Sequence, residues 1–352
     1  MKWKVLFCFV TMSLLFGGCK RGEKQETAKR IITLGAYTVP KEVYEQIVFP
    51  KFKEYWKKRT GEDVEFKASY VGSGSQSRAI AAGFEADIAA LSLEWDIIRL
   101  ENAGLITTDW CKKFPYSGIV TRSLDVIGVR KGNPHNIHEW EDLKQKGLEV
   151  LHPNPRTSGG AMWDVLAIYG SALKETEVST GEKNLDLAAA RLRGIEKNVK
   201  MMGKSQRINV TYFEQGLGDV IVTYENELKL RQRQGKDYEI VYPRSTILIE
   251  NPVAIVDTYV ERHGNRDVVE GFVNFLWTED VQRGFAEFGF RVPHEKVARE
   301  YAWKYPEVDL VFTIDYYGGW PKAVEAMFGP DGTWTKIMED LGKPEAGLKE
   351  EK

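Results

Sequence analysis

The sequence predicts an α/β protein built on open, mostly parallel sheets. From Ile31 onward, short apolar runs alternate with segments of helical periodicity, which is the strand–helix order that produces parallel sheets. The 352 residues suffice for one large domain or two medium ones, and 43% hydrophobic with 28% charged residues is ordinary for a globular chain. Because no Gly/Ser-rich linker divides the chain, two lobes would have to be joined by strands.

The strands are predicted from short apolar or alternating runs. Residues 86–92 form an apolar run typical of a buried strand, whereas 64–70 alternates apolar and polar residues, as a half-exposed strand does. Pro252 removes one ladder donor from the last strand. The predicted strands are 31–37, 64–70, 86–92, 123–134, 149–155, 218–227, 238–243 and 246–257.

The helices are predicted between these strands from periodicity and from residues that end helices. Gly61 closes the first helix, because glycine readily adopts the left-handed conformation found after a last turn. Trp163, Leu166 and Tyr169 recur at a spacing that places them on a core-facing side. The predicted helices are 41–59, 77–85, 161–173, 185–199 and 266–289.

The N-terminus has the features of an export signal. Two lysines precede an apolar run from Val5 to Phe16, which is shorter than the roughly 20 residues that a membrane-spanning helix needs. Two glycines then precede Cys19, as in a bacterial lipobox, where the cysteine becomes acylated; a plain cleaved signal peptide is the alternative. We therefore expect a signal peptide over 1–18, a lipidated Cys19 and a flexible tether over 19–30.

Charge and motifs exclude several functional classes. A net charge of −2 gives no electrostatic basis for binding nucleic acid. Neither of the Gly/Ser turns at 72–75 and 157–160 continues into the Gly-Lys-Ser/Thr of a P-loop, and neither is a Gly-x-Ser-x-Gly nucleophile turn. His135 and His138, three residues apart, fit a polar turn better than a metal site, and the sequence has no Cys/His cluster of metal-ligand spacing. We therefore expect no enzymatic activity, no cofactor and no metal.

Two turns have the composition of an anion site. Thr-Ser-Gly-Gly at 157–160 follows the strand 149–155 and leads into a helix, and Gly-Ser-Gly-Ser at 72–75 follows the strand 64–70 in the same way. The first amides of a helix have no acceptor within it, and the helix dipole favours negative charge at this end. A plain helix cap explains one such turn, but two in one chain favour an anion site.

Longer motifs resemble those of the sulfate-binding protein family, the solute receptors of bacterial sulfate and thiosulfate ABC importers. The resemblance extends from near Ile31 to about residue 340, and PNPRTSGGAMW together with GLGDVIVTYENE is its most specific part. The other matching motifs are YEQ, GSGSQS, ADIAALS, VRKGNPHNIHEWEDL, FGFRVP and FTIDYYGGWPKA.

The resemblance implies a two-lobed periplasmic-binding-protein fold of type II. Each lobe is expected to be an open mixed sheet flanked by helices, with the ligand in the cleft between the lobes. Lobe 1 is expected to hold residues 31–118 and about 252–290, and lobe 2 to hold 119–251. The C-terminal segment 291–352 is expected to pack on one lobe or the other.

The family holds a dehydrated dianion with neutral hydrogen-bond donors, and the resemblance assigns those donors here. Ser158 corresponds to a hydroxyl donor, and backbone amides come from its neighbours and from the other turns. Tyr224 stands where the family usually has a tryptophan. The expected ligand-binding residues are Thr38, Ser73, Ser158, Gly159, Gly160, Ser205 and Tyr224.

The function implied is that of a monomeric receptor, lipid-anchored at the periplasmic or outer face of a bacterial membrane. It would capture sulfate or thiosulfate and deliver the anion to an ABC permease driven by an ATPase. Two alternatives stay open. A phenol differs from an indole in reach and shape, so the Tyr224 pocket could prefer molybdate or tungstate. The receptor could also signal to a membrane kinase instead of serving transport.

Overall fold

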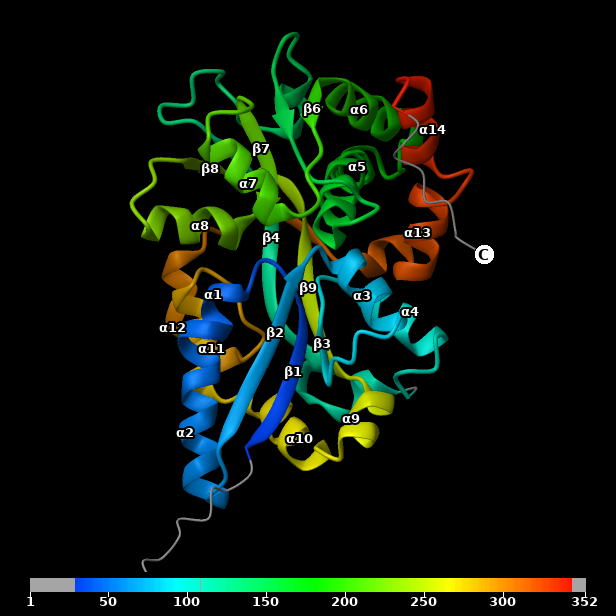
Figure 1. Ribbon diagram of the computed structural model, residues 1–352. Helices are drawn as coiled ribbons and strands as arrows, with labels where there is room; N and C mark the ends of the chain where they lie inside the picture. The colour runs from blue at the N-terminus through cyan, green and yellow to red at the C-terminus, as the bar shows by residue number, and fades with distance from the viewer. Residues whose placement is uncertain (1–28, 108, 344–352) are drawn as a thin grey trace, which may run out of the picture.

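The computed structural model describes residues 29–107 and 109–343, which fold into two lobes, one above the other in Figure 1. The predicted signal peptide, Cys19 and the tether up to residue 28 lie outside the described residues. In the two described ranges, no helix combines the length and the apolar character that crossing a membrane requires. The lower lobe in the figure is called lobe 1, and the upper one lobe 2.

Ten strands of the described chain form one mixed sheet that runs through both lobes. They are β1 (Arg30–Tyr37), β2 (Val64–Val71), β3 (Ile88–Ala90), β4 (Ile119–Val129), β5 (Val150–Leu151), β6 (Val199–Met201), β7 (Val220–Tyr224), β8 (Glu239–Val241), β9 (Ser245–Ile255) and β10 (Leu310–Phe312). The order is β2-β1-β3-β9-β4-β7-β5-β6, with β10 beside β9 and β8 beside β4. The pairs of β1 with β2 and β3 are parallel, but β4 is antiparallel to β7, β8 and β9, so the sheet is mixed.

Helices flank the sheet in both lobes (Figure 1). Those of lobe 1 are α1 (Lys41–Val43), α2 (Phe49–Thr60), α3 (Ser73–Ala81), α4 (Glu94–Asn102), α9 (Asp257–His263), α10 (Arg266–Phe275), α11 (Glu279–Glu287) and α12 (Glu295–Tyr301). Those of lobe 2 are α5 (Gly159–Thr180), α6 (Leu185–Asn198), α7 (Gln206–Glu214), α8 (Glu225–Arg233), α13 (Trp320–Phe328) and α14 (Thr333–Asp340).

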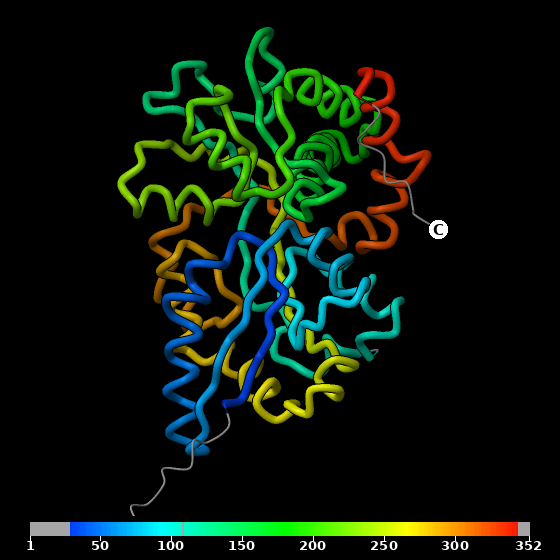
Figure 2. The backbone as a smooth tube through the Cα atoms, viewed as in Figure 1, coloured from blue at the N-terminus to red at the C-terminus, as the bar shows by residue number. Residues whose placement is uncertain are grey.

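Strands β4 and β9 join the two lobes (Figures 1 and 2). The first half of β4, Ile119–Leu124, pairs with the middle of β9, Leu248–Pro252. Beyond this stretch, Asp125–Val129 of β4 pairs with β7 in lobe 2, and Val253–Ile255 of β9 pairs with β3 in lobe 1. A change in the angle between the lobes would therefore have to bend this strand pair.

The segment that follows residue 290 contacts both lobes. Helix α12 packs on α11 of lobe 1, where Arg283 and Glu300 form an ion pair at 2.7 Å. Strand β10 then pairs with the start of β9, and α13 and α14 pack on lobe 2. The ring of Trp320 in α13 meets that of Trp163 in α5 edge-on, with centroids 4.6 Å apart.

Several predicted boundaries are wrong next to the turns. The predicted helix 77–85 begins earlier, at Ser73, because Gly72 takes the extended cap conformation. The predicted strand 218–227 ends at Tyr224, and its acidic residues start α8, where they complement the helix dipole. The predicted strand 149–155 is reduced to β5. The predicted helix 266–289 is two helices, α10 and α11, because the extended Thr278 caps the second.

Candidate anion-binding site

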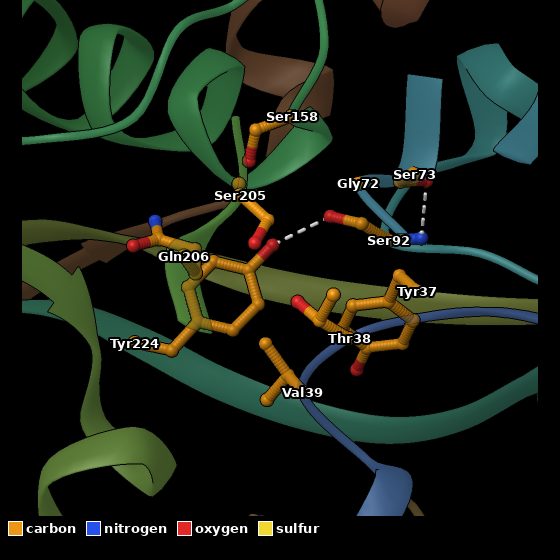
Figure 3. A pocket seen from close by; sticks show the side chains of 11 residues that line it. Tyr37, Thr38, Val39, Gly72, Ser73, Ser92, Ser158, Ser205, Gln206 and Tyr224 are labelled. Carbon is orange, nitrogen blue, oxygen red and sulfur yellow. Dashed lines mark hydrogen bonds between the residues drawn. The ribbon is translucent and has the colours of Figure 1, made fainter. Parts of the chain in front are cut away.

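A small pocket lies between the lobes (Figure 3). Lobe 1 lines it with the end of β1 and with the segments before α3 and α4, and lobe 2 with the segments that lead into α5, α7 and α8. All the lining side chains are neutral: they bear hydroxyl or amide groups or are apolar. The lining residues are Tyr37, Thr38, Val39, Gly72, Ser73, Ser92, Ser158, Gly160, Ser205, Gln206 and Tyr224.

The residues predicted from the sequence come together here from five separate segments. All of them except Gly159 line the pocket. Gly159 lies just beside it, since a Cβ atom added there would be 3.0 Å from the Oγ of Ser92. The sequence prediction missed five lining residues, namely Tyr37, Val39, Gly72, Ser92 and Gln206. Four of them adjoin a predicted residue, and Ser92 ends the apolar run 86–92, so its position after a buried strand was the available signal.

Four helices begin at the pocket. The residues that precede their first turns are Gly72 for α3, Ser158 for α5, Ser205 for α7 and Tyr224 for α8, and all four line the pocket. The first backbone N–H groups of each helix have no acceptor within that helix. Four positive dipole ends therefore converge on one small space, and the arrangement favours an anion there without a basic side chain.

Two glycines allow these helix ends to come close together. A Cβ atom on Gly72 would lie 2.4 Å from the carbonyl oxygen of Thr157, so only glycine lets the start of α3 touch lobe 2. A Cβ atom on Gly160 would lie 2.4 Å from the Cγ of Gln206. The absence of a side chain at the second residue of α5 therefore lets it pack closely against α7. The glycines of both predicted turns thus serve close approach of backbones as well as exposure of amides.

Ser73 and Ser158 differ in what their hydroxyl groups can offer a ligand. The Ser73 hydroxyl donates to the buried carboxylate of Asp96 at 2.6 Å and accepts from the backbone N–H of Ser92 at 2.9 Å. Its single hydrogen is therefore committed, and only the Ser73 amide can face a ligand. The Ser158 hydroxyl does not cap its own helix and points toward the pocket in Figure 3.

A pair of hydroxyl groups bridges the lobes at the pocket. The Oγ of Ser92 in lobe 1 and the phenol oxygen of Tyr224 in lobe 2 are 2.6 Å apart (Figure 3). Ser92 is held in place because its carbonyl oxygen accepts from the indole of Trp163 at 3.0 Å and from the amide of Asn251 at 2.8 Å. Burial raises the pKa of Tyr224 well above its ordinary value, so the phenol stays neutral. One of the two hydroxyl hydrogens makes the bond between Ser92 and Tyr224, and the other can be donated to a ligand.

Further contacts hold the lobes together around the pocket. The Arg207 guanidinium in lobe 2 donates to the carbonyl of Val39 at 3.0 Å and to the Glu42 carboxylate at 2.9 Å, both in lobe 1. On the other side of the pocket, Arg78 donates to the carbonyl of Arg156 at 2.9 Å. The lobes are therefore closed on each other. The guanidinium of Arg207, which belongs to α7, is already paired.

Fold and pocket together define a two-lobed binding protein with a closed interlobe site. The model of a family described as bacterial extracellular solute-binding protein matches residues 33–291. The chain belongs to this family, whose members are binding proteins and not enzymes.

Individual relatives agree with this membership. The chain is 41% identical to a sulfate-binding protein of Synechococcus elongatus over 88% of this chain and 86% of the relative. It is 32% identical to a thiosulfate-binding protein of Pseudomonas aeruginosa over 92% of this chain and 97% of the relative. Among solved structures, the sulfate-binding protein SubI from Mycobacterium tuberculosis is 35% identical and superimposes with a TM-score of 0.75, over 84% of this chain and 98% of that one.

Proposed function

We propose that the protein is an extracytoplasmic receptor that captures sulfate or thiosulfate and delivers it to an ABC permease and its ATPase. One observation carries the proposal: four helix N-termini and several hydroxyl groups converge on a pocket whose lining side chains are all neutral. The names of the sulfate-binding and thiosulfate-binding relatives support this choice of anion. Family membership supports a place outside the cytoplasm.

The start of α5 is the principal part of the proposed site. Ser158 donates its hydroxyl hydrogen, and Gly159 and Gly160 donate their backbone N–H groups, so three donors come from three consecutive residues. Charge-assisted hydrogen bonds of this kind are about twice as strong as neutral ones. A dianion stripped of water needs such donors at every oxygen, because burying an unpaired charge is very costly.

The remaining proposed donors come from four other segments. Thr38 and Ser73 contribute backbone amides, the latter because its hydroxyl hydrogen is committed to Asp96. Ser205 contributes from the start of α7, where its oxygen accepts from the backbone N–H of Ile208 at 3.3 Å and its hydrogen is left to donate. Tyr224 contributes its phenol from the start of α8.

A site of this composition would select anions by protonation. Sulfate carries no proton at neutral pH, whereas phosphate carries one or two. The phosphate O–H would face backbone N–H groups that cannot accept it, and an unpaired buried polar group costs about 1–3 kcal/mol. Sites that leave such a group unpaired can discriminate by several orders of magnitude. We therefore propose that phosphate is rejected; molybdate and tungstate, which like sulfate carry no proton at neutral pH, are the alternative ligands.

Ser92 and Tyr224 act as one donor in this proposal, which predicts unusual mutational behaviour. Ser92→Ala or Tyr224→Phe alone leaves one hydroxyl hydrogen for the anion, so each should weaken sulfate binding by less than about tenfold. Removing both hydroxyls removes the donor, and the double variant should lose about 100-fold or more in affinity. Calorimetric titration measures all three. Thr223→Val, on the same strand but outside the pocket, serves as the control. If the double variant loses no more affinity for sulfate than the product of the two single losses, the shared donor is contradicted.

We propose that a hinge motion between the lobes accompanies uptake and release of the anion. An anion that contacts α3 in lobe 1 and α5 in lobe 2 favours the closed state, because it binds that state better. The proposed lobes are residues 31–118 with about 252–290, and 119–251, joined by β4 and β9. We also propose that the receptor is monomeric and that a lipid on Cys19 keeps it at the membrane, with the chain up to residue 30 as a tether.

The function is tested by calorimetric titration with sulfate, thiosulfate, molybdate, tungstate and phosphate at fixed pH. The protein is first unfolded and refolded to remove bound anion. We expect tight binding of sulfate or thiosulfate and no response to phosphate. Preference for molybdate or tungstate would overturn the proposed ligand, and silence toward every one of these anions would overturn the proposed function.

A further inference from the structure

Two buried carboxylic acids lie directly behind the pocket in lobe 2. Asp125 on β4 and Asp164 on α5 are both fully buried, and their carboxyl groups lie close enough to interact directly. Asp125 is the cross-strand partner of Tyr224. Asp164 accepts from the side-chain amide of Gln206 at 2.7 and 3.0 Å. Because Tyr224 and Gln206 both line the pocket, a single side chain separates the acid pair from the ligand space.

The contact between the two acids requires a proton. Within the described residues, no side chain other than that of Asp164 offers a hydrogen bond to the Asp125 carboxyl group, whose other near donor is the backbone N–H of Val126. Two adjacent buried carboxylates cannot both be ionised, since neither can donate to the other and their charges repel. Burial raises the pKa of both acids well above the ordinary value, and for Asp164 the proximity of Asp125 raises it further. The pair therefore holds at least one proton.

The groups that face the acid pair bring no positive charge that would neutralise it. They are Gln206 from α7, Tyr224 from β7 and Glu196 from α6. Glu196 is itself held by His152 at 3.2 Å and by the indole of Trp334 at 2.7 Å. Burial opposes the ionisation of His152, but its contact with Glu196 outweighs burial and leaves the pKa of His152 raised. His152 is thus the nearby base to be distinguished from the acid pair in any titration.

We infer that the Asp125–Asp164 pair is a proton site linked to the anion pocket, so that sulfate capture takes up one proton when the pair is ionised. This inference rests on the proposed function. Gly160 and Asp164 lie four residues apart on α5 and so on the same face, about 6 Å apart along the axis. A dianion at the Gly160 amide repels a negative charge on the pair across this short, poorly screened distance. A proton from solvent, bound by the ionised carboxylate, removes that repulsion, while sulfate itself stays unprotonated.

The direction of the pH effect follows from this repulsion. The anion raises the pKa of the pair, so affinity is highest below the pKa of the anion-free pair. Affinity then falls by about tenfold per pH unit, for one linked proton, until the pH exceeds the pKa of the pair in the complex. Sulfate neither gains nor loses a proton near or above neutral pH, so a pH dependence of its affinity comes from the protein.

The test is calorimetric titration of the purified protein with sulfate between pH 6 and 9.5, in pairs of buffers with different ionisation enthalpies. We expect proton uptake that rises toward one per sulfate and a parallel loss of affinity. Asp125→Asn leaves Asp164 as the single ionisable acid, buried beside an amide donor, so sulfate binding should weaken only at pH values where Asp164 is ionised. The double variant D125N/D164N cannot ionise here, so it should take up no proton and bind with an affinity independent of pH.

The outcomes separate this inference from the proposed function. Sulfate binding by the natural protein with no proton uptake at any pH overturns the role of the acid pair and leaves the receptor function standing. Proton uptake that persists in D125N/D164N also overturns it and assigns the proton to another group of the protein. If sulfate fails to bind at every pH, the proposed function falls, and the acid-pair inference falls with it.

Discussion

Replacing Gly160 with proline is expected to lower the affinity for sulfate by at least about 100-fold more than replacing it with alanine. Proline removes the backbone N–H that the proposed site uses, and loss of one fixed donor to an oxyanion typically costs about 100- to 1,000-fold. Gly160 is the second residue of α5, a first-turn position where proline keeps the helix intact.

Alanine is the necessary control for that experiment. Any side chain at residue 160 places a Cβ atom 2.4 Å from the Cγ of Gln206, whose amide is tied to Asp164. Gly160→Ala suffers this clash but keeps its N–H group, so the difference between the two variants isolates the amide. Affinities come from calorimetry, and thermal unfolding checks that both variants fold. Equal affinities would show that the Gly160 amide does not contact the anion.

Arg207→Gln is expected to reduce stability strongly and to loosen the closed lobes. Its guanidinium donates to the fully buried Glu227 at 2.9 and 3.0 Å and, across the cleft, to Glu42. Removing one partner of a buried ion pair costs about 3–5 kcal/mol, because the other charge stays desolvated, and Arg231, which remains 3.5 Å from Glu227, places the cost at the lower end of this range. For a chain of 352 residues, about 3–5 kcal/mol corresponds to a fall in Tm of roughly 4–7 °C, because the entropy of unfolding is about 2.1 cal/mol/K per residue.

The matched control removes the opposite end of the same bridge. The Glu42 side chain is 22% exposed, whereas that of Glu227 is 0% exposed, so Glu42→Gln should cost no more than about 1 kcal/mol. Scanning calorimetry measures both variants in the absence of anion. Tm values lowered equally by the two substitutions would contradict the view that burial of Glu227 makes Arg207 important.

Much of the fold follows from local patterns. The strand–helix alternation predicted an α/β chain, and the strands around Ile31, Val64 and Ile88 lie where the apolar runs indicated. The extent of β4 and β9 was not predictable, because their length depends on pairing with each other and with strands of both lobes. Helix α8 was missed because Glu225 directly follows the last residue of β7, with no turn residue between them.

The candidate site was predicted in part. Ser158 and Ser73 could be found because serine and glycine before a helix are a recognisable signal, and the family resemblance added Tyr224. Ser92 could not be identified as the partner of Tyr224, since the two are 132 residues apart and come from different lobes. The contact between Asp125 and Asp164 is equally invisible in the sequence, because it joins a strand to a helix across the interior of lobe 2.

The central claim is that neutral donors alone hold the dianion, and a crystal structure of the refolded protein with selenate tests it most directly. Selenium has an anomalous signal that identifies the bound ion, and selenate has the charge and tetrahedral shape of sulfate. We expect one selenium site in the pocket, with oxygens in contact with Ser158, Gly160 and the Ser92–Tyr224 pair and no Lys or Arg side chain within hydrogen-bonding distance. Selenate bound by a basic side chain, or bound only outside the interlobe pocket, would contradict it.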